Sequence, residues 1–167
     1  KRQLGVSLFR VVPGVLASLW AADLVQPPRG CAPSEVAKAL SVWVQEHHGG
    51  LPSFLLVERP QKYGTKRATH RGVQSLLDVL EEIRRVCVPS MVGYQEVRPL
   101  EWKGNTTKGP HHLRARRVLS DVEAPHWHRD HNVRDGIALG LWAVGRLDAG
   151  TTPGGRGPSL GFRGIDP

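Results

Sequence analysis

The chain has few cysteines, few aromatic residues and no long hydrophobic run. Its 167 residues include two cysteines, Cys31 and Cys87, which are too few for a disulfide framework and too far apart for a zinc site. No apolar run approaches the length of about 18 residues that crosses a membrane. No basic segment followed by an apolar core opens the sequence. These absences argue against secretion and membrane insertion, and they predict an intracellular protein with reduced thiols.

Acidic side chains are also scarce. The chain has 15 Asp and Glu against 23 Lys and Arg, which gives a formal net charge of +8. A strongly basic protein suits a polyanionic partner, and nucleic acid is the leading candidate, with a merely soluble basic protein as the alternative. The length suits one domain around a single core.

Hydrophobic periodicity and turn residues predict an α/β fold. A hairpin is expected over residues 4–9 and 15–25, with Val12-Pro-Gly14 in its turn. The expected helices cover 33–47, 73–86, 111–119 and 132–146, and the further strands cover 54–58 and 91–100. Val36, Leu40 and Val44 share one face of the first helix, and Leu76, Leu77, Leu80 and Ile83 share the inward face of the second. We expect a βαβ crossover from the hairpin through the helix at 33–47 into the strand at 54–58.

Glu58 ends a continuous apolar run, Phe54 to Val57, and Pro60 stops the strand. Such a run is typical of a strand that is buried on both faces. The carboxyl edge of an open α/β sheet is where ligands bind, so Glu58 is a candidate ligand. An ordinary polar strand end is the alternative.

The segment from Arg59 to Arg71 is basic and follows Glu58 directly. Cations there suit phosphate contacts, and an aromatic ring could stack on a base. A solvated loop is the alternative. The candidate DNA contacts in this segment are Lys62, Tyr63, Lys66, Arg67, His70 and Arg71. A second expected loop, 102–108, carries Lys103 and Lys108.

Asp135 lies at the start of the helix at 132–146, where small residues allow close approach to a sheet. It is a second candidate ligand, with a simple helix-capping carboxylate as the alternative. His126, His128 and His131 with Asp130 form a further candidate metal group, although a surface cluster is the alternative. Imidazoles suit zinc, whereas carboxylates suit magnesium or manganese.

Residues 148–157 read as a linker or tail, and 160–167 alternate like a strand that ends at Asp166. By itself this segment reads as a disordered terminus. Placed before Lys1, it completes a hairpin whose turn is cut, so the order of the chain reads as circularly rotated. We therefore expect one nuclease-like domain from 1–147, with 158–167 as its first strand.

In that order the chain resembles a RuvC-type Holliday junction resolvase of the ribonuclease H-like superfamily, over nearly its whole length. Gly164-Ile-Asp-Pro167 matches the opening strand of the family, Val57-Glu58 its second acidic strand, and Asp135-Gly-Ile-Ala138 its last acidic helix. His70-Arg-Gly-Val73 and Trp102-Lys-Gly104 match two weaker family patterns. The family usually has an Asp or His three residues before its last aspartate, and here that residue is Asn132.

The resemblance implies a five-stranded mixed β-sheet flanked by helices and an active site with two Mg²⁺ ions, for which Mn²⁺ substitutes. Asp166 would bridge the ions, Glu58 and Asp135 would flank it, and His131 or Asn132 would complete the shell. Lys103 and Lys108 would contact phosphates, and Tyr63 would act as a wedge in the junction.

The implied substrate is a four-way DNA junction that is resolved by paired cuts, and the implied assembly is a homodimer. The helix at 73–86 is the expected interface, with ordinary core as the alternative. Two other functions stay open: a related nuclease that cuts flaps, forks or RNA–DNA hybrids, and a DNA-binding module without catalysis.

Overall fold

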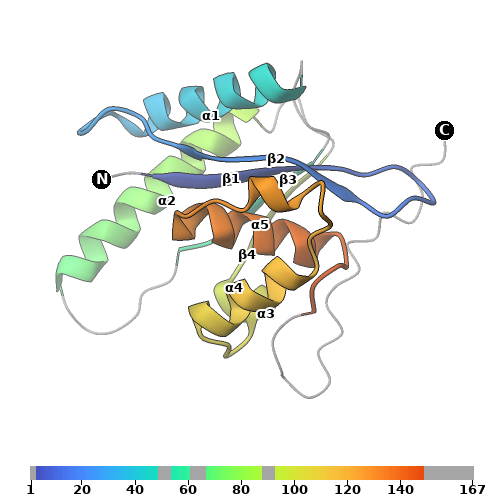
Figure 1. The fold of residues 1–167 in the computed structure, drawn as a ribbon. Coiled ribbons are helices and arrows are strands. Elements are labelled where there is room, and N and C mark those ends of the chain that lie inside the picture. The colour runs from blue at the N-terminus through green and yellow to red at the C-terminus, as the bar shows by residue number, and fades with distance from the viewer. Residues whose placement is uncertain (1–2, 49–53, 61–66, 88–92, 149–167) are drawn as a thin grey trace. The chain divides into compact units, whose positions relative to one another are not determined.

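The computed structural model describes residues 3–48, 54–60, 67–87 and 93–148 (Figure 1). The chain divides into two compact units. The first unit contains residues 1–4 and 25–99, and the second contains residues 5–24 and 100–167.

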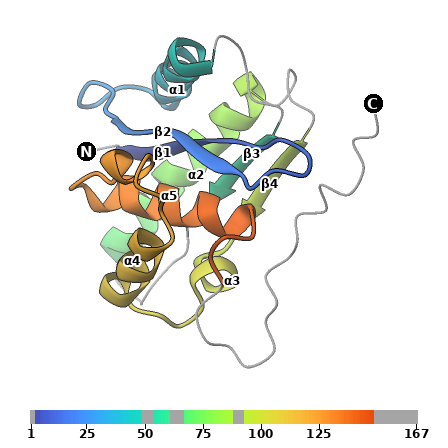
Figure 2. The ribbon, with the colours of Figure 1, turned by 45° about the vertical axis from the view of Figure 1, so that its right-hand side comes forward.

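The first unit is built on a parallel strand pair, β3 (Phe54–Glu58) and β4 (Gly93–Val97). Phe54 lies opposite Gly93 and Glu58 opposite Val97, and the two strands run side by side in Figure 2. A Cβ atom on Gly93 would lie 2.5 Å from the ring of Phe54, so the ring covers the glycine. The five residues of β3 are half-buried, which corrects the prediction of a strand buried on both faces.

Two helices pack together in this unit, α1 (Pro33–His48) and α2 (Arg67–Cys87). The backbone N–H of Ala32 donates to Glu35 Oε2 at 2.6 Å, which fixes the start of α1 where it was predicted. The predicted face of α1 is confirmed, because Val36, Leu40 and Val44 are buried. In α2 the buried residues are Val73, Val79, Leu80, Ile83 and Cys87, whereas Leu76 is 39% exposed and Leu77 is half-buried.

The observed βαβ unit is β3–α2–β4, because α2 connects the two parallel strands. The predicted crossover through α1 is therefore wrong for the sheets that the structure describes. The strand before α1 is β2 (Ser18–Val25), and it pairs with β1 (Leu4–Arg10).

The second unit contains the β1–β2 hairpin and the helices α3 (Pro99–Lys103), α4 (Lys108–Arg117) and α5 (His131–Ala143), with the short 3₁₀ helix η2 (Ala124–His126). Apart from Leu4, Val25 and Pro99, these elements lie wholly in the unit. Seven residues join the two strands, too few for a parallel crossover. In the turn, the N–H of Val15 donates to the carbonyl of Val12 at 3.0 Å, and Gly14 has φ of 74°. The predicted hairpin is confirmed.

Strand β1 lies directly against α5, because glycines leave room for the contact. A Cβ on Gly140 would lie 2.1 Å from the ring of Phe9. A Cβ on Gly5 would lie 1.8 Å from the carbonyl oxygen of Asn132. Ser7 Oγ donates to the carbonyl of Gly136 at 2.8 Å. The prediction that small residues on this helix allow close approach to a strand is confirmed.

The predicted loop at 102–108 is confirmed for residues 104–107 and is wrong at both ends, because Trp102 and Lys103 belong to α3 and Lys108 begins α4. Trp102 is fully buried in α3, and its ring meets His111 of α4 edge to face at 4.9 Å. Gly104, with φ of 58°, follows α3, and α4 begins at Lys108 rather than at residue 111.

Two two-stranded sheets, β1–β2 and β3–β4, are the sheets in the described part of the chain, rather than one five-stranded sheet. The expected first strand at 160–166 lies outside the described residues. Within the residues searched, no helix has both the length and the apolar character of a membrane span.

Candidate functional site

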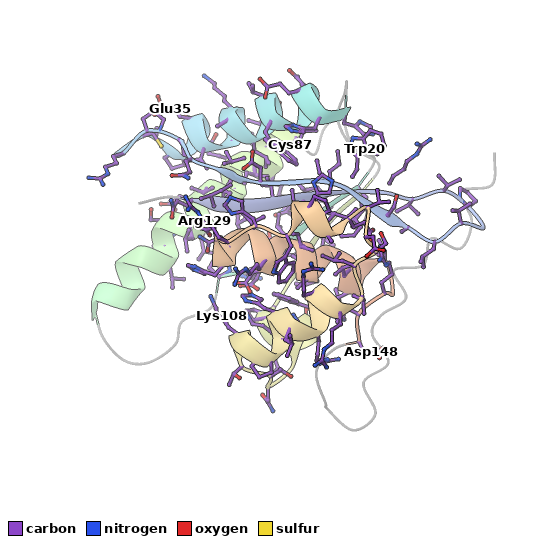
Figure 3. The ribbon with its side chains drawn as sticks, viewed as in Figure 1. Trp20, Glu35, Cys87, Lys108, Arg129 and Asp148 are labelled. Carbon is purple, nitrogen blue, oxygen red and sulfur yellow. The ribbon has the colours of Figure 1, made fainter. Side chains whose placement is uncertain are left out.

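Helices α4 and α5 lie side by side in the second unit and bring three polar side chains together (Figures 1 and 2). Asp135 Oδ1 is 2.8 Å from His112 Nε2, and Asp135 Oδ2 is 3.2 Å from Lys108 Nζ. We call these three residues the Asp135 cluster. Lys108 starts α4 (Figure 3), and its side chain is 56% exposed, whereas that of Asp135 is 21% exposed. The carboxylate is therefore partly accessible and both of its oxygens have a partner.

The pKa of Asp135 is lowered although burial, the largest single influence, raises it. The hydrogen bond with His112 and the charges of Lys108 and Lys103 lower the pKa by more than burial raises it. Asp135 is therefore ionised at neutral pH, as a metal ligand or phosphate-site carboxylate must be. The capping interpretation of Asp135 is wrong, because the N-cap of α5 is Asp130, whose Oδ1 accepts from the N–H of Asn132 at 2.8 Å.

Aromatic rings support the Asp135 cluster from the side. The ring of His112 meets Trp127 edge to face, with centroids 6.2 Å apart. The guanidinium of Arg134 lies 5.7 Å from the centroid of Trp127, and its Nε donates to the carbonyl of His128 at 2.7 Å. These contacts restrict the rotation of His112, and so they help to fix the Asp135 carboxylate.

His111 is the fully buried neighbour of this cluster. Burial, followed by the electrostatic influence of His112, Arg114 and Lys103, lowers the pKa of His111 to about 4. The side chain is therefore neutral at pH 7. Neither ring nitrogen has a hydrogen-bond partner within the part of the chain that the structure describes.

Of the predicted phosphate contacts, Lys103 and Lys108 lie near the same carboxylate, since the charges of both lower the pKa of Asp135. The ammonium group of Lys103 also lies 4.9 Å from the centroid of the Trp102 ring. His112 was missed by sequence reasoning, because its role depends on the packing of α4 against α5 and no local pattern indicates it.

Glu58 stands at the carboxyl end of β3, as predicted, and belongs to the first unit. The next residue, Arg59, is joined to β4 twice. Its N–H donates to the carbonyl of Val97 at 2.8 Å, and its Nε is 3.8 Å from Glu96 Oε2. Tyr94 donates to Glu96 Oε1 at 2.9 Å, so the strand end next to Glu58 is tied by polar contacts.

Several predicted site residues cannot be placed. Asp166, Lys62, Tyr63 and Lys66 lie outside the described residues, and for Arg67, His70 and Arg71 the structure gives only the helical backbone at the start of α2. Because Glu58 and Asp135 belong to separately described units, their meeting stays a prediction.

The residues Asp130, His131 and Asn132 begin α5 or cap it. His128 Nδ1 accepts a hydrogen bond from the N–H of Asp130 at 3.0 Å, so this loop is held by its own contacts. Across the described ranges there is no group of three or more His, Cys, Asp or Glu side chains that could hold a metal ion. The described residues by themselves therefore do not form a metal centre, and the proposed one also requires Asp166.

A buried ion pair that sequence reasoning missed ties the second unit together. Arg146 Nη1 and Nη2 donate to Glu123 at 2.5 and 2.8 Å, and the two side chains are 8% and 4% exposed. Glu123 also accepts from the N–H groups of Leu19 and Ser120 at 2.7 and 2.9 Å. The spacing of Ser120 and Glu123 is that of a capping box, a signal that could have marked Glu123 as structural.

Comparison with family models and with curated proteins finds no significant match. Two solved structures are similar to the chain. Thermus thermophilus RuvC in complex with a Holliday junction substrate has a TM-score of 0.55 and 17% identity, and Thermus thermophilus RuvC alone has a TM-score of 0.50 and 19% identity. In both cases 83% of this chain and 84% of the other chain are covered.

At these identities the likeness establishes the fold. Both structural neighbours are RuvC structures, so the chain has a RuvC-like, mixed α/β fold. The resemblance drawn from the short acidic motifs is confirmed at this level.

Proposed function

We propose that this protein is a metal-dependent endonuclease that cuts branched DNA and resolves four-way junctions. The observation that carries the proposal is the RuvC-like fold over 83% of the chain, together with a neighbour that was solved with a Holliday junction substrate. The net charge of +8 and the ionised Asp135 beside two lysines support it.

The proposed metal ligands are Asp166, Glu58 and Asp135, with His131 or Asn132 completing the shell. The carboxylate and amide oxygens of this set suit Mg²⁺, with Mn²⁺ as a substitute, whereas an imidazole from His131 suits softer metals. Divalent ions held by these residues would supply an activated water and would neutralise charge on the phosphate. Of this set, Asp135 has the ionisation and partial exposure that a ligand needs.

The chain's own residues would position the DNA. Lys108, which contacts Asp135 in the structure, and Lys103 would bind phosphate oxygens next to the cut. Lys62, Lys66, Arg67, His70 and Arg71 would follow the backbone of the junction, and Tyr63 would stack at its centre. His112 would keep Asp135 in one orientation when Lys108 moves to a phosphate.

We also infer the assembly and the order of strands. Two symmetric cuts imply a homodimer, with residues 73–86 of α2 as the proposed interface. The exposed Leu76 on that helix favours this choice. Residues 158–167 would supply the first strand beside β1, with 148–157 as a linker.

The test is cleavage of four synthetic substrates in Mg²⁺: four-way junctions, flaps, linear duplexes and RNA–DNA hybrids. We expect symmetric cutting of the junction. Glu58→Gln and Asp135→Asn should each reduce cutting by more than about 100-fold, because each removes charge from the reacting centre. Glu46→Gln and Asp121→Asn, which change exposed carboxylates in the same way, should leave cutting unchanged.

Other outcomes would favour the alternatives. Preferred cutting of flaps, forks or hybrids would support a related nuclease of the same fold. Binding of junctions without any cutting, unchanged in the Glu58 and Asp135 variants, would support a DNA-binding module and overturn the proposed activity.

A further inference from the structure

Helix α4 carries positive charge without any negative charge. Its ten residues include Lys108, Arg114, Arg116 and Arg117 and contain no Asp or Glu. The helix buries His111, His112 and Ala115 against the rest of the second unit. The opposite face points to solvent and carries Arg117, and Arg116 is exposed at the edge of the buried face.

The four cations of α4 differ in their partners. Lys108 contacts Asp135, and Arg114 Nη2 donates to the carbonyl of Asp148 at 3.1 Å. Arg116 and Arg117 form no ion pair with any carboxylate among the residues that the structure places. The end of α4 thus presents two uncompensated guanidinium groups.

The last turn of α2 offers a direct contrast, because it also contains two arginines. There Arg85 pairs with Glu82 at 2.8 Å, and the guanidinium of Arg84 lies 5.9 Å from the centroid of the Tyr94 ring. The helix dipole stabilises cations at the C-terminus of any helix, so it accounts for both arginine pairs equally. The dipole does not explain why Arg116 and Arg117 have no carboxylate partner among the described residues, whereas Arg85 has one.

The exposed arginines lie at the end of α4 that is farther from the Asp135 cluster. Lys108 begins α4 in the Asp135 cluster, and Arg117 ends it nine residues later, which is about 13 Å at 1.5 Å per residue. At about 100° per residue, the same nine residues turn the helix by about 900°, so Arg117 lies on the side of α4 opposite to Lys108. The two arginines are therefore placed to contact DNA away from the Asp135 cluster rather than beside it.

We propose that the exposed end of α4, through Arg116 and Arg117, binds backbone phosphates of the duplex arm that leads away from the cut. The inference rests on the proposed function, since it takes the Asp135 cluster as the site of cutting. Arginine suits this task because its guanidinium matches two phosphate oxygens at once. Backbone contacts of this kind carry no sequence information and give affinity to junction and duplex alike.

The experiment measures binding of the full chain to a four-way junction and to a linear duplex between 50 and 200 mM salt, without divalent ions. The variants are Arg116→Ala with Arg117→Ala, and the control Arg29→Ala with Lys38→Ala, which removes equal charge from exposed positions outside the proposed DNA contacts and the proposed dimer interface. Loss of two phosphate contacts should lower the slope of log K against log salt by about 1.8. Wild-type affinity should then fall about tenfold more over this range than that of the α4 variant.

The control variant should keep the wild-type slope. Equal effects of the two double variants would show that net charge alone matters, and would overturn the role of α4. If the wild type binds and cuts junctions but the α4 variant keeps the wild-type slope of log K against log salt, the proposed role of Arg116 and Arg117 is wrong. The proposed function would then still stand. Absence of DNA binding by the wild type would instead overturn the proposed function.

Discussion

Removal of Arg146 should destabilise the protein strongly, because this side chain holds three segments of the second unit. Its guanidinium pairs with Glu123 and also donates to the carbonyls of Ala17 and Val118, at 2.9 and 2.6 Å. Methionine in its place keeps much of the apolar stem and removes every one of these hydrogen bonds. Arg146→Met then leaves the buried Glu123 carboxylate without its cationic partner.

Breaking a buried ion pair from one side costs about 3–5 kcal/mol. Typical domains have a free energy of unfolding of about 5–15 kcal/mol, so this is a large share. At about 2–4 °C per kcal/mol for a chain of this size, the midpoint of thermal unfolding should fall by roughly 10 °C.

Urea unfolding at pH 7 measures the effect, and Arg85→Met is the matched control. Arg85 pairs with Glu82 on the surface of α2, where its side chain is 67% exposed, and such a pair contributes about 0–1 kcal/mol. A cost for Arg146→Met below about 1 kcal/mol, equal to the control, would refute the importance of burial for this pair.

Acid provides a second readout of the same pair. The hydrogen bond from Arg146 is the largest cause of the lowered pKa of Glu123 in the folded protein. Its stabilisation is therefore complete above the unfolded pKa of about 4.3, and it is lost as the pH falls further. Below about pH 4, the free energy of unfolding should therefore decrease less steeply with falling pH in Arg146→Met than in the wild type.

Two more predictions concern packing and pH. Gly140→Ala should cost about 1–3 kcal/mol in urea unfolding, because the new methyl group would overlap the ring of Phe9, whereas Gly109→Ala in an open part of a helix should be neutral or slightly stabilising. A cost that is equal for the two glycines would contradict the packing argument. The pKa of His111 is about 4 in the folded protein and about 6.5 in the unfolded chain, so the unfolded chain binds a proton first as the pH falls. The free energy of unfolding should therefore be highest above pH 6.5 and should decrease by about 3 kcal/mol as the pH drops to 4. His111→Phe should flatten this slope, and a wild-type stability that stays level over the same range would exclude a buried neutral imidazole.

The local order of the chain was determined by the sequence itself. Turn residues and alternation placed the hairpin around Gly14, and an acidic first turn with apolar residues at helical spacing placed α1 around Glu35. The apolar run before Glu58 marked the end of β3 correctly. Such features depend on neighbours within a few residues, so they can be read without the fold.

Tertiary structure alone decided which distant residues meet. The parallel partner of β3 is β4, reached through α2, and no local pattern distinguishes that crossover from the one through α1. Trp102 lies in a helix because its ring is buried against His111, in a stretch whose polar residues suggested a loop. The pairs His112 with Asp135 and Glu123 with Arg146 are each 23 residues apart in sequence. They exist because packed elements bring their side chains together, and burial and long-range contact are properties of the folded chain that residue order encodes only indirectly.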